Sequence, residues 1–504
     1  MQSVAFVISL IMLLLGIDLG TSSVKVSVVS AETQETIVSV SYPEQEADII
    51  SLQTGWAEQS PDVWWEHTVQ AIQKAHSARK YNPQDIKAIG ISYQMHGLVV
   101  ADKDNNILRN AIIWCDSRAV EIGERALQEM GRDKILKSHL NSPGNFTAAK
   151  LAWIKINEPQ LYQRIAKIML PGDFLTMKLT GEINTTISAL SEGIFWNFRE
   201  NNISSIVLDY FGFDRNMIPE INPVFSNHGI LTSEVADLLQ LSRDTVVSYK
   251  AGDQPNNALS LNVLNPGEAA ATAGTSGVIY GVSNQLVSDP NSRVNTFAHV
   301  NYLPEDVKTG ILLCINGTGI QNSWIKKILG PNLSYDELNA LGQQAPIGSK
   351  GLKILPFGNG AERMLNNRIV QSHIQYIDFN KHGRAEMIRA CQEGIAFSFR
   401  YGFDILRENG INSSVIRAGY TNLFLSPLFC SSFVNTTSTP VELFESDGSK
   451  GAALGSGIGI HYYSSPKEAF SNINKIRTVE PVHKDLYEDL YEEWKTTLHN
   501  MIKQ

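Results

Sequence analysis

A single carboxylate followed by a hydroxyl-rich turn is the first pattern in this chain that could do chemistry. Asp18 ends an apolar run that starts at Leu13, and residues 19–23, Leu-Gly-Thr-Ser-Ser, follow it directly. N–H groups and hydroxyls of such a turn can bind phosphate oxygens, with the carboxylate placed for a phosphate-bound Mg²⁺. This assigns Asp18 to a metal ion and Thr21 and Ser22 to a nucleotide. The alternative is a hairpin turn whose aspartate satisfies its own backbone.

A second turn of the same kind occurs in the other half of the chain. Residues 273–277, Ala-Gly-Thr-Ser-Gly, also stand between two apolar runs. Neither turn is a Walker A sequence or a dinucleotide GxGxxG, but two such turns can hold a nucleotide from opposite sides. The sequence therefore indicates nucleotide contacts at Gly274, Thr275 and Ser276. Taken alone, each turn is also compatible with a simple connection between strands.

The composition favours small-molecule partners. The 504 residues are 43% hydrophobic and 18% charged, the net charge is -9, and no block of lysine and arginine occurs. Such a chain lacks the electrostatic basis for binding nucleic acid. The four cysteines are far apart and form no CxxC pair, which argues against a zinc site or a disulfide framework and favours a reducing, cytoplasmic compartment.

Strand-like and helical patterns alternate, which predicts an α/β fold. Because residues 20–24 are echoed by residues 274–278, we expect two domains that are built alike and meet over one ligand. The predicted division is a first domain over 12–250 and a second over 251–504, with 1–11 as an N-terminal extension.

The apolar start of the chain has two interpretations. The run from Val4 to Ile17 resembles a signal sequence or a membrane span. However, no basic residue precedes Lys25, and the run ends at Asp18, short of the roughly 20 residues that a membrane helix needs. We therefore predict a buried strand from about Leu13 and no membrane partner.

Several segments, in this order, resemble the FGGY family of carbohydrate kinases. They are the Asp18 turn, Gly55-Trp56-Ala57-Glu58-Gln59, Trp64-Trp65, Met95-His96-Gly97, Trp114-Cys115-Asp116-Ser117-Arg118, Lys178-Leu179-Thr180-Gly181, Gly252-Asp253 and Ala273 to Gly277. The resemblance runs from about Leu13 to the end of the chain. It implies two ribonuclease-H-like domains of the actin-like ATPase type with a cleft between them, with sugar mainly on the first and ATP mainly on the second.

The resemblance also implies roles for single residues. Asp253 corresponds to the general base that accepts the proton of the attacking hydroxyl, taken to be O5 of xylulose, while Asp18 organises Mg²⁺. Met95 and His96 are similar to the sugar-binding motif of the family's xylulose kinases, since an imidazole can hydrogen-bond a hydroxyl and a methionine can form an apolar wall. The expected reaction is the ATP-dependent phosphorylation of D-xylulose to D-xylulose 5-phosphate. Asp253 is also compatible with a helix N-cap, and His96 with a structural role.

The chain departs from the family pattern in the sugar and adenosine regions. Gln254 stands where the family usually has asparagine, so Gln254 is a candidate sugar contact and ribulose or gluconate remain alternative substrates. Residues 417–422 stand where relatives carry glycines against the adenosine. Gly419 and Asn422 are the nucleotide contacts expected there, and a catalytically silent ATP-binding sensor is the alternative for the whole chain.

Other segments keep two interpretations. Gly317 precedes a helical pattern and could present its N–H to phosphate or simply form a turn. Trp56, Glu58, Trp64 and Trp65 are compatible with the cleft, although aromatic residues before a helix more often belong to the core. The sequence leaves open whether the chain forms a homodimer.

Overall fold

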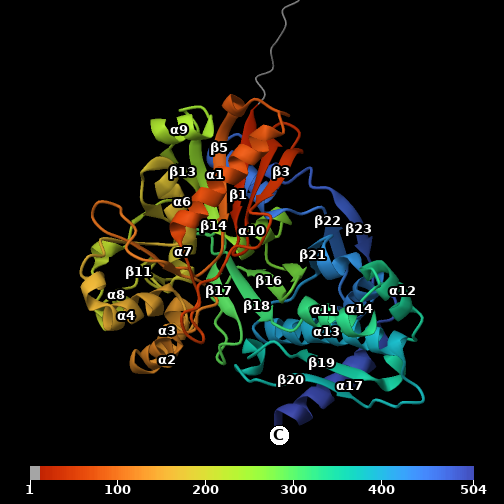
Figure 1. Cartoon of the computed structure of the whole chain (residues 1–504). Coiled ribbons are helices and arrows are strands. Elements are labelled where there is room, and N and C mark those ends of the chain that lie inside the picture. Colours follow the sequence, from red (N-terminus) through yellow and green to blue (C-terminus); the bar gives the residue numbers. More distant parts are fainter. Residues whose placement is uncertain (1–11, 504) are drawn as a thin grey trace, which may run out of the picture. The chain divides into compact units, whose positions relative to one another are not determined.

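The computed structural model describes residues 12–503, so the predicted extension over 1–11 lies outside the described residues. The chain divides into two compact units (Figure 1). Unit 1 contains the residues up to Asn262 together with Asp447–Asn472, and unit 2 contains Val263–Ser446 and the residues from Ile473 onward.

Unit 1 is built on a six-stranded sheet in the order β13-β14-β5-β1-β2-β3. Strands β1, β5 and β14 are parallel, whereas the β1–β2, β2–β3 and β13–β14 pairs are antiparallel. Leu19 pairs with Val24, so residues 20–23 form the turn between β1 and β2. The strand bounds are β1 Leu13–Leu19, β2 Val24–Ser30, β3 Thr36–Tyr42, β5 Ile86–Tyr93, β13 Phe225–Ile230 and β14 Val246–Gly252.

Unit 2 has a seven-stranded sheet in the order β17-β18-β16-β15-β21-β22-β23. Here β15, β21 and β22 are parallel, and the other pairs are antiparallel. Ala273 pairs with Gly277, so residues 274–276 form the turn between β15 and β16. The bounds are β15 Glu268–Ala273, β16 Gly277–Ser283, β17 Asn295–Ala298, β18 Thr309–Ile315, β21 Val415–Gly419, β22 Val441–Phe444 and β23 Lys475–Val479.

The two sheets share one connectivity. In each, a central strand forms a hairpin with the next strand on one side and pairs with a parallel strand on the other, and a second parallel strand pairs with that one in turn. The two hydroxyl-rich turns therefore occupy equivalent places, at the first hairpin of each sheet. The repeated sequence correctly indicated two similarly built sheets.

Helix α15 (Gly448–Gly459) belongs to unit 1 although it comes late in the chain. It packs against β1, β5 and β14. A Cβ at Gly16 would lie 1.7 Å from the carbonyl oxygen of Ser449, and a Cβ at Gly90 would lie 1.9 Å from that of Ala452. The helix backbone thus rests directly on glycines of two neighbouring strands, which no larger residue would allow.

The two units consequently differ from the predicted domains over 12–250 and 251–504. The predicted boundary falls before Ala251, but Ala251 and Gly252 are the last residues of β14. Helix α10 (Asp253–Ser260) follows in the same unit, and residues 447–472 return to that unit because of the glycine contacts of α15.

Helices cover the sheets and enclose one apolar core in each unit. In unit 1, α1 (Pro61–Ser77) packs against β2 and β3, and α6 (Pro171–Thr180) packs against β5 and β14. In unit 2, α13 (Arg384–Glu408) contacts both α11 (Gly319–Leu329) and α14 (Pro427–Thr437), as Figure 1 shows.

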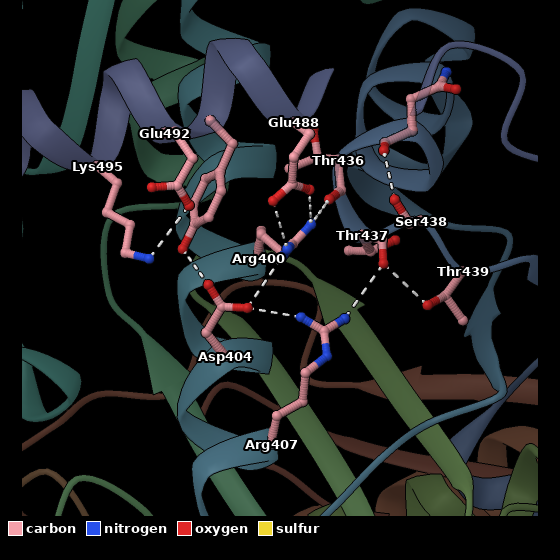
Figure 2. Close-up of polar contacts among 12 residues, drawn as sticks. Arg400, Asp404, Arg407, Thr436, Thr437, Ser438, Thr439, Glu488, Glu492 and Lys495 are labelled. Atoms are coloured by element: carbon pink, nitrogen blue, oxygen red, sulfur yellow. Dashed lines mark hydrogen bonds and ion pairs between the residues drawn. The ribbon is translucent and has the colours of Figure 1, made fainter. Parts of the chain in front are cut away.

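A charged cluster fixes the C-terminal helix α17 (Lys484–Lys503) in unit 2 (Figure 2). Arg400 of α13 donates to both carboxylate oxygens of Glu488, at 2.9 and 3.1 Å, and to the carbonyl oxygen of Thr436 at 2.7 Å. Arg407 donates to the carbonyl of Thr437 at 3.4 Å and to Asp404 at 2.6 Å. Two arginines therefore satisfy carbonyls at the end of α14, and Arg400 also binds α17.

Candidate active site

Asp18 and Asp253 interact electrostatically within unit 1. Asp18 lies near the carboxyl end of β1, and Asp253 directly follows β14, which is parallel to β1 through β5. Burial, together with the smaller effect of the charge of Asp18, raises the pKa of Asp253 to about 7. Burial also raises the pKa of Asp18, whereas a hydrogen bond from the side chain of Ser92 lowers it to a smaller extent. The fold thus places two carboxylates where the charge of Asp18 makes ionisation of Asp253 less favourable.

The start of α15 closes one side of Asp18. A Cβ at Gly448 would lie 2.5 Å from Asp18 Oδ2, so the main chain of the helix approaches the carboxylate closely. The neighbouring Asp447 forms an ion pair with Lys25 at 2.6 Å and also raises the pKa of Asp18. Asp447 was not among the predicted site residues, because only the tertiary contact of α15 brings it there.

Met95 and His96 follow β5 and lie beside the main chain that leads into Asp253. A Cβ at Gly252 would lie only 2.6 Å from Met95 Cγ. His96 has a positive φ of 62°, which is uncommon for a residue with a side chain. Lys150 is buried and donates to the carbonyl oxygen of His96 at 2.7 Å. The structure therefore gathers the predicted sugar contacts beside the predicted base.

Gln254 also faces Asp253. Its backbone N–H and its side chain both hydrogen-bond the carboxylate, which lowers the pKa of Asp253 and partly opposes the effect of burial. In this structure the side chain of Gln254, which is longer than that of asparagine, therefore hydrogen-bonds the carboxylate of Asp253.

Glu192 is a site residue that the sequence did not reveal. It ends α7 (Ile187–Glu192), is 2% exposed, and accepts a hydrogen bond of 3.0 Å from the hydroxyl of Tyr93. Its Oε2 lies 3.7 Å from His96 Nδ1. A single acid in a segment of apolar and small hydroxyl residues was the only available signal.

The motifs around Trp56 and Arg118 serve the scaffold of unit 1. Arg118 stacks over Trp56, with 3.9 Å from its guanidinium carbon to the ring centroid. It also forms ion pairs of 2.7 Å with Glu58 and with Asp116. This cluster joins two segments that lie about sixty residues apart in the sequence. Of the two roles that the sequence allowed for Trp56 and Glu58, their contacts favour the structural one.

Three further tryptophans of the matched motifs divide between the core and the first turn. Trp64 is buried and donates to Gln59 at 3.0 Å, and Trp65 packs against the same core. Trp114 is 52% exposed and donates from Nε1 to the hydroxyl of Thr21 at 2.9 Å. The Thr21 hydroxyl keeps its own proton for another acceptor, and Ser22 is exposed beside it.

Unit 2 contains a cavity of about 510 Å³ at its own hydroxyl-rich turn. The turn is tied to α11, because the N–H of Gly319 donates to the carbonyl of Gly274 at 2.9 Å and that of Ile320 to the carbonyl of Thr275 at 3.1 Å. The residues that line the cavity are Ala273, Gly274, Thr275, Gly319, Ile320, Asn322, Ser323, Tyr335, Asp336, Asn339, Asn422, Leu423, Leu425 and Ser426.

Only some of the predicted nucleotide contacts meet in this cavity. Gly274, Thr275 and Asn422 line it, whereas Ser276, Gly317 and Gly419 do not. A Cβ at Gly317 would lie 1.3 Å from the carbonyl oxygen of Pro356, so this glycine permits a close chain crossing. The N–H of Gly317 donates a hydrogen bond to the carboxylate of Glu362, so this N–H already has an acceptor and does not need a phosphate oxygen.

The geometry described above has close counterparts among known proteins. The model of the FGGY family of carbohydrate kinases, N-terminal domain, matches residues 13–260. A xylulose kinase of Haemophilus influenzae is 31% identical over 414 residues, which cover 80% of this chain and 81% of that protein. The chain belongs to the FGGY family of carbohydrate kinases.

The likeness extends over nearly the whole chain of other members. A xylulose kinase of Bacillus subtilis is 28% identical over 499 residues, covering 94% of this chain and 96% of that protein. The crystal structure of a kinase from Brucella ovis described as a xyloylose kinase superposes with a TM-score of 0.87 at 25% identity, covering 97% of this chain and 100% of that one. The predicted α/β class, with two ribonuclease-H-like domains of the actin-like ATPase type, is confirmed.

Two further features concern the predicted absence of a membrane span and of disulfides. None of the helices described in the structure combines the length and the apolar composition that a membrane span needs. In the described part of the chain, the four cysteines, Cys115, Cys314, Cys391 and Cys430, are thiols that form no disulfide.

Proposed function

We propose that this kinase transfers the terminal phosphoryl group of ATP to D-xylulose and releases ADP and D-xylulose 5-phosphate. The observation that supports the proposal is that Gly252, the residue before Asp253, lies against Met95, while the pKa of Asp253 is raised to about 7. The curated relatives that match along most of the chain are xylulose kinases.

In this proposal Asp253 is the general base. A carboxylate with a pKa near the working pH can accept a proton and still be ionised in a large fraction of the molecules. The hydroxyl oxygen of the sugar forms a bond to the γ-phosphorus as the bond from that phosphorus to the β-γ bridging oxygen breaks, and the hydroxyl proton moves to Asp253. Phosphoryl transfer needs little else from the protein than positioning and charge stabilisation.

Asp18 is proposed to hold Mg²⁺ with the nucleotide. The described residues contain no group of three or more His, Cys, Asp or Glu side chains that could hold a metal by themselves. A pair of carboxylates with raised pKa nevertheless suits this ion, because Mg²⁺ keeps several waters and needs only one or two carboxylates together with phosphates. When bound, Mg²⁺ would neutralise the negative charge of the phosphates.

The cavity of unit 2 is proposed to hold the nucleoside and the phosphates next to it. Ile320, Tyr335 and Leu425 provide an apolar surface that suits a purine ring, and Asn422 provides an amide. The N–H groups of the turn at Gly274 and Thr275 are proposed to bind phosphate oxygens, as are Thr21 and Ser22 of the first turn. Ser276, Gly317 and Gly419 remain predictions that the cavity does not support.

A sugar-panel assay tests the proposal. Release of ADP is measured with D-xylulose, D-ribulose, gluconate and glycerol, and kcat/KM for D-xylulose should exceed the others. Asp253→Asn should lower kcat by at least about 100-fold, since general-base catalysis contributes about that factor. Sugar-dependent ADP release at an unchanged rate in this variant would exclude Asp253 as the base.

Two alternatives are decided by the same assay. Gln254 motivates a kinase for ribulose or gluconate, which would show a higher kcat/KM than D-xylulose. The replacement of the adenosine glycines motivates a catalytically silent ATP-binding sensor, which would bind ATP but phosphorylate none of the sugars. A cytoplasmic location is part of this proposal, and a homodimer stays a prediction that size-exclusion chromatography with light scattering can test.

A further inference from the structure

The buried carboxyl of Glu192 lies at the proposed sugar site and has no part in the mechanism described above. Tyr93, at the end of β5, donates its hydroxyl to Glu192 Oε1 at 3.0 Å and fixes the orientation of the carboxyl. The second oxygen, Oε2, then lies 3.7 Å from Nδ1 of His96. A Cβ at Gly252 would lie 3.3 Å from the same oxygen, which places it beside the main chain that carries Asp253.

The surroundings hold the imidazole of His96 in one place. Its main chain adopts a positive φ of 62°, and its carbonyl oxygen accepts a hydrogen bond of 2.7 Å from the buried Lys150. The ring meets that of Phe146 edge to face, with 4.6 Å between centroids. Since both the main chain and the ring are constrained, the remaining freedom of His96 is the choice of the ring nitrogen that carries the hydrogen.

We propose that Glu192 is a positioning residue that fixes the tautomer of His96: the O–H of its neutral carboxyl, on Oε2, donates a hydrogen bond to Nδ1, so that the ring carries its hydrogen on Nε2, where it can be donated to an oxygen of the bound sugar. The inference rests on the proposed function in one respect, because that proposal brings the sugar to His96. The distance of 3.7 Å exceeds a hydrogen bond by about half an ångström, which a small rotation of either side chain closes, so we expect the bond both in the free protein and in the sugar complex.

The chemistry of the site favours a neutral Glu192 as the donor. Burial raises the pKa of Glu192 well above its ordinary value, and the charges of Asp253 and Asp173 act in the same direction. Hydrogen bonds from Tyr93 and from the main chain of His96 oppose this effect. A neutral carboxyl whose Oε1 already accepts from Tyr93 has one hydrogen to give, and His96 Nδ1 is the nearest ring nitrogen.

Two substitutions separate this role from a structural one. In Glu192→Gln, the amide oxygen can still accept from Tyr93 while the NH2 group donates to His96, so the KM for the sugar should stay within about twofold of the wild-type value. Glu192→Leu removes both functions and should raise the KM for the sugar about tenfold, with the KM for ATP unchanged. Glu393→Gln alters a carboxyl of unit 2 that is also 2% exposed, and should leave the sugar KM unchanged.

A measurement without substrate tests the tautomer directly. In a sample with ¹⁵N-labelled histidine, the ring signals of His96 are assigned by their loss in His96→Gln. The wild type and Glu192→Gln should show the Nε2–H form, and Glu192→Leu should show a mixture of both tautomers. An Nδ1–H form in the wild type, or equal sugar KM values in the Gln and Leu variants, would overturn the inference.

Failure of the proposed function is recognised separately. If the wild-type protein phosphorylates no sugar of the panel, the proposed function fails, while the ring signals of His96 still decide whether Glu192 sets the tautomer. If D-xylulose is phosphorylated but Glu192→Leu has the wild-type KM for it, only the positioning role fails.

Discussion

Replacement of the proposed base by its neutral amide should stabilise the protein, and increasingly so as the pH rises. The pKa of Asp253 is about 7 in the folded chain, compared with an ordinary value of 3.8. A carboxyl whose pKa is higher in the folded than in the unfolded state makes its full contribution to stability only when the pH is below its pKa in the unfolded chain. This contribution is lost as the pH rises through its pKa in the folded chain. Between about pH 4 and pH 7, the wild type should therefore lose stability relative to Asp253→Asn.

The structure bounds the size of the effect. The difference between the two pKa values corresponds to about 4 kcal/mol for a completely buried group. Asp253 is half-buried, and solvent screens its interactions, so we expect about 1–2 kcal/mol. The expected gain in stability accompanies a loss of catalysis, as is common for groups that are held in unfavourable surroundings for function.

Urea unfolding followed by tryptophan fluorescence provides the assay. Six of the eight tryptophans lie in unit 1, which contains Asp253, so the signal reports mainly on that unit. The difference in unfolding free energy between Asp253→Asn and the wild type should be near zero at pH 4.5 and reach about 1–2 kcal/mol at pH 8. Asp244→Asn makes the same chemical change at an exposed position of unit 1 and should show no such trend. A difference that does not change with pH would refute a raised pKa at Asp253.

Three further substitutions test the packing and the nucleotide site. Gly16→Ala places a Cβ 1.7 Å from the carbonyl oxygen of Ser449, and should lower the unfolding free energy of unit 1 by about 3 kcal/mol in urea titrations. Arg400→Met breaks the bidentate ion pair with Glu488 and should lower the stability of unit 2 by about 2 kcal/mol, seen as a lower melting temperature in calorimetry. Thr275→Val should raise the KM for ATP about threefold or more in steady-state kinetics and leave the KM for the sugar unchanged.

Each of these substitutions has a control and an outcome that would contradict it. Gly383→Ala adds a methyl group whose nearest neighbour is 3.6 Å away, and should be tolerated in contrast to Gly16→Ala. Lys495→Met removes an ion pair of 3.4 Å with Glu492 on the same helix and should cost much less than Arg400→Met. An equal rise of both KM values in Thr275→Val would argue against a nucleotide role for that hydroxyl.

The sequence by itself determined the features that depend on local order. The carboxylate of Asp18 and the two turns at 20–23 and 274–276 are short patterns at the ends of apolar strands, and each turn lies between two strands as the flanking apolar runs predicted. The start of α1 at Pro61 is also local in origin, because proline suits the first position of a helix. The motif order also sufficed to indicate the family and the proposed role of Asp253.

Only the tertiary structure decided which distant segments share a site. Helix α15 lies in unit 1 because Gly16 and Gly90 leave room for its main chain, and this contact cannot be read from either segment alone. Glu192 reaches His96 in the same way, through a fold that buries a single acid beside a strand end. Contacts between residues far apart in sequence depend on the shapes of both surfaces, whereas turns and caps depend on the residues next to them.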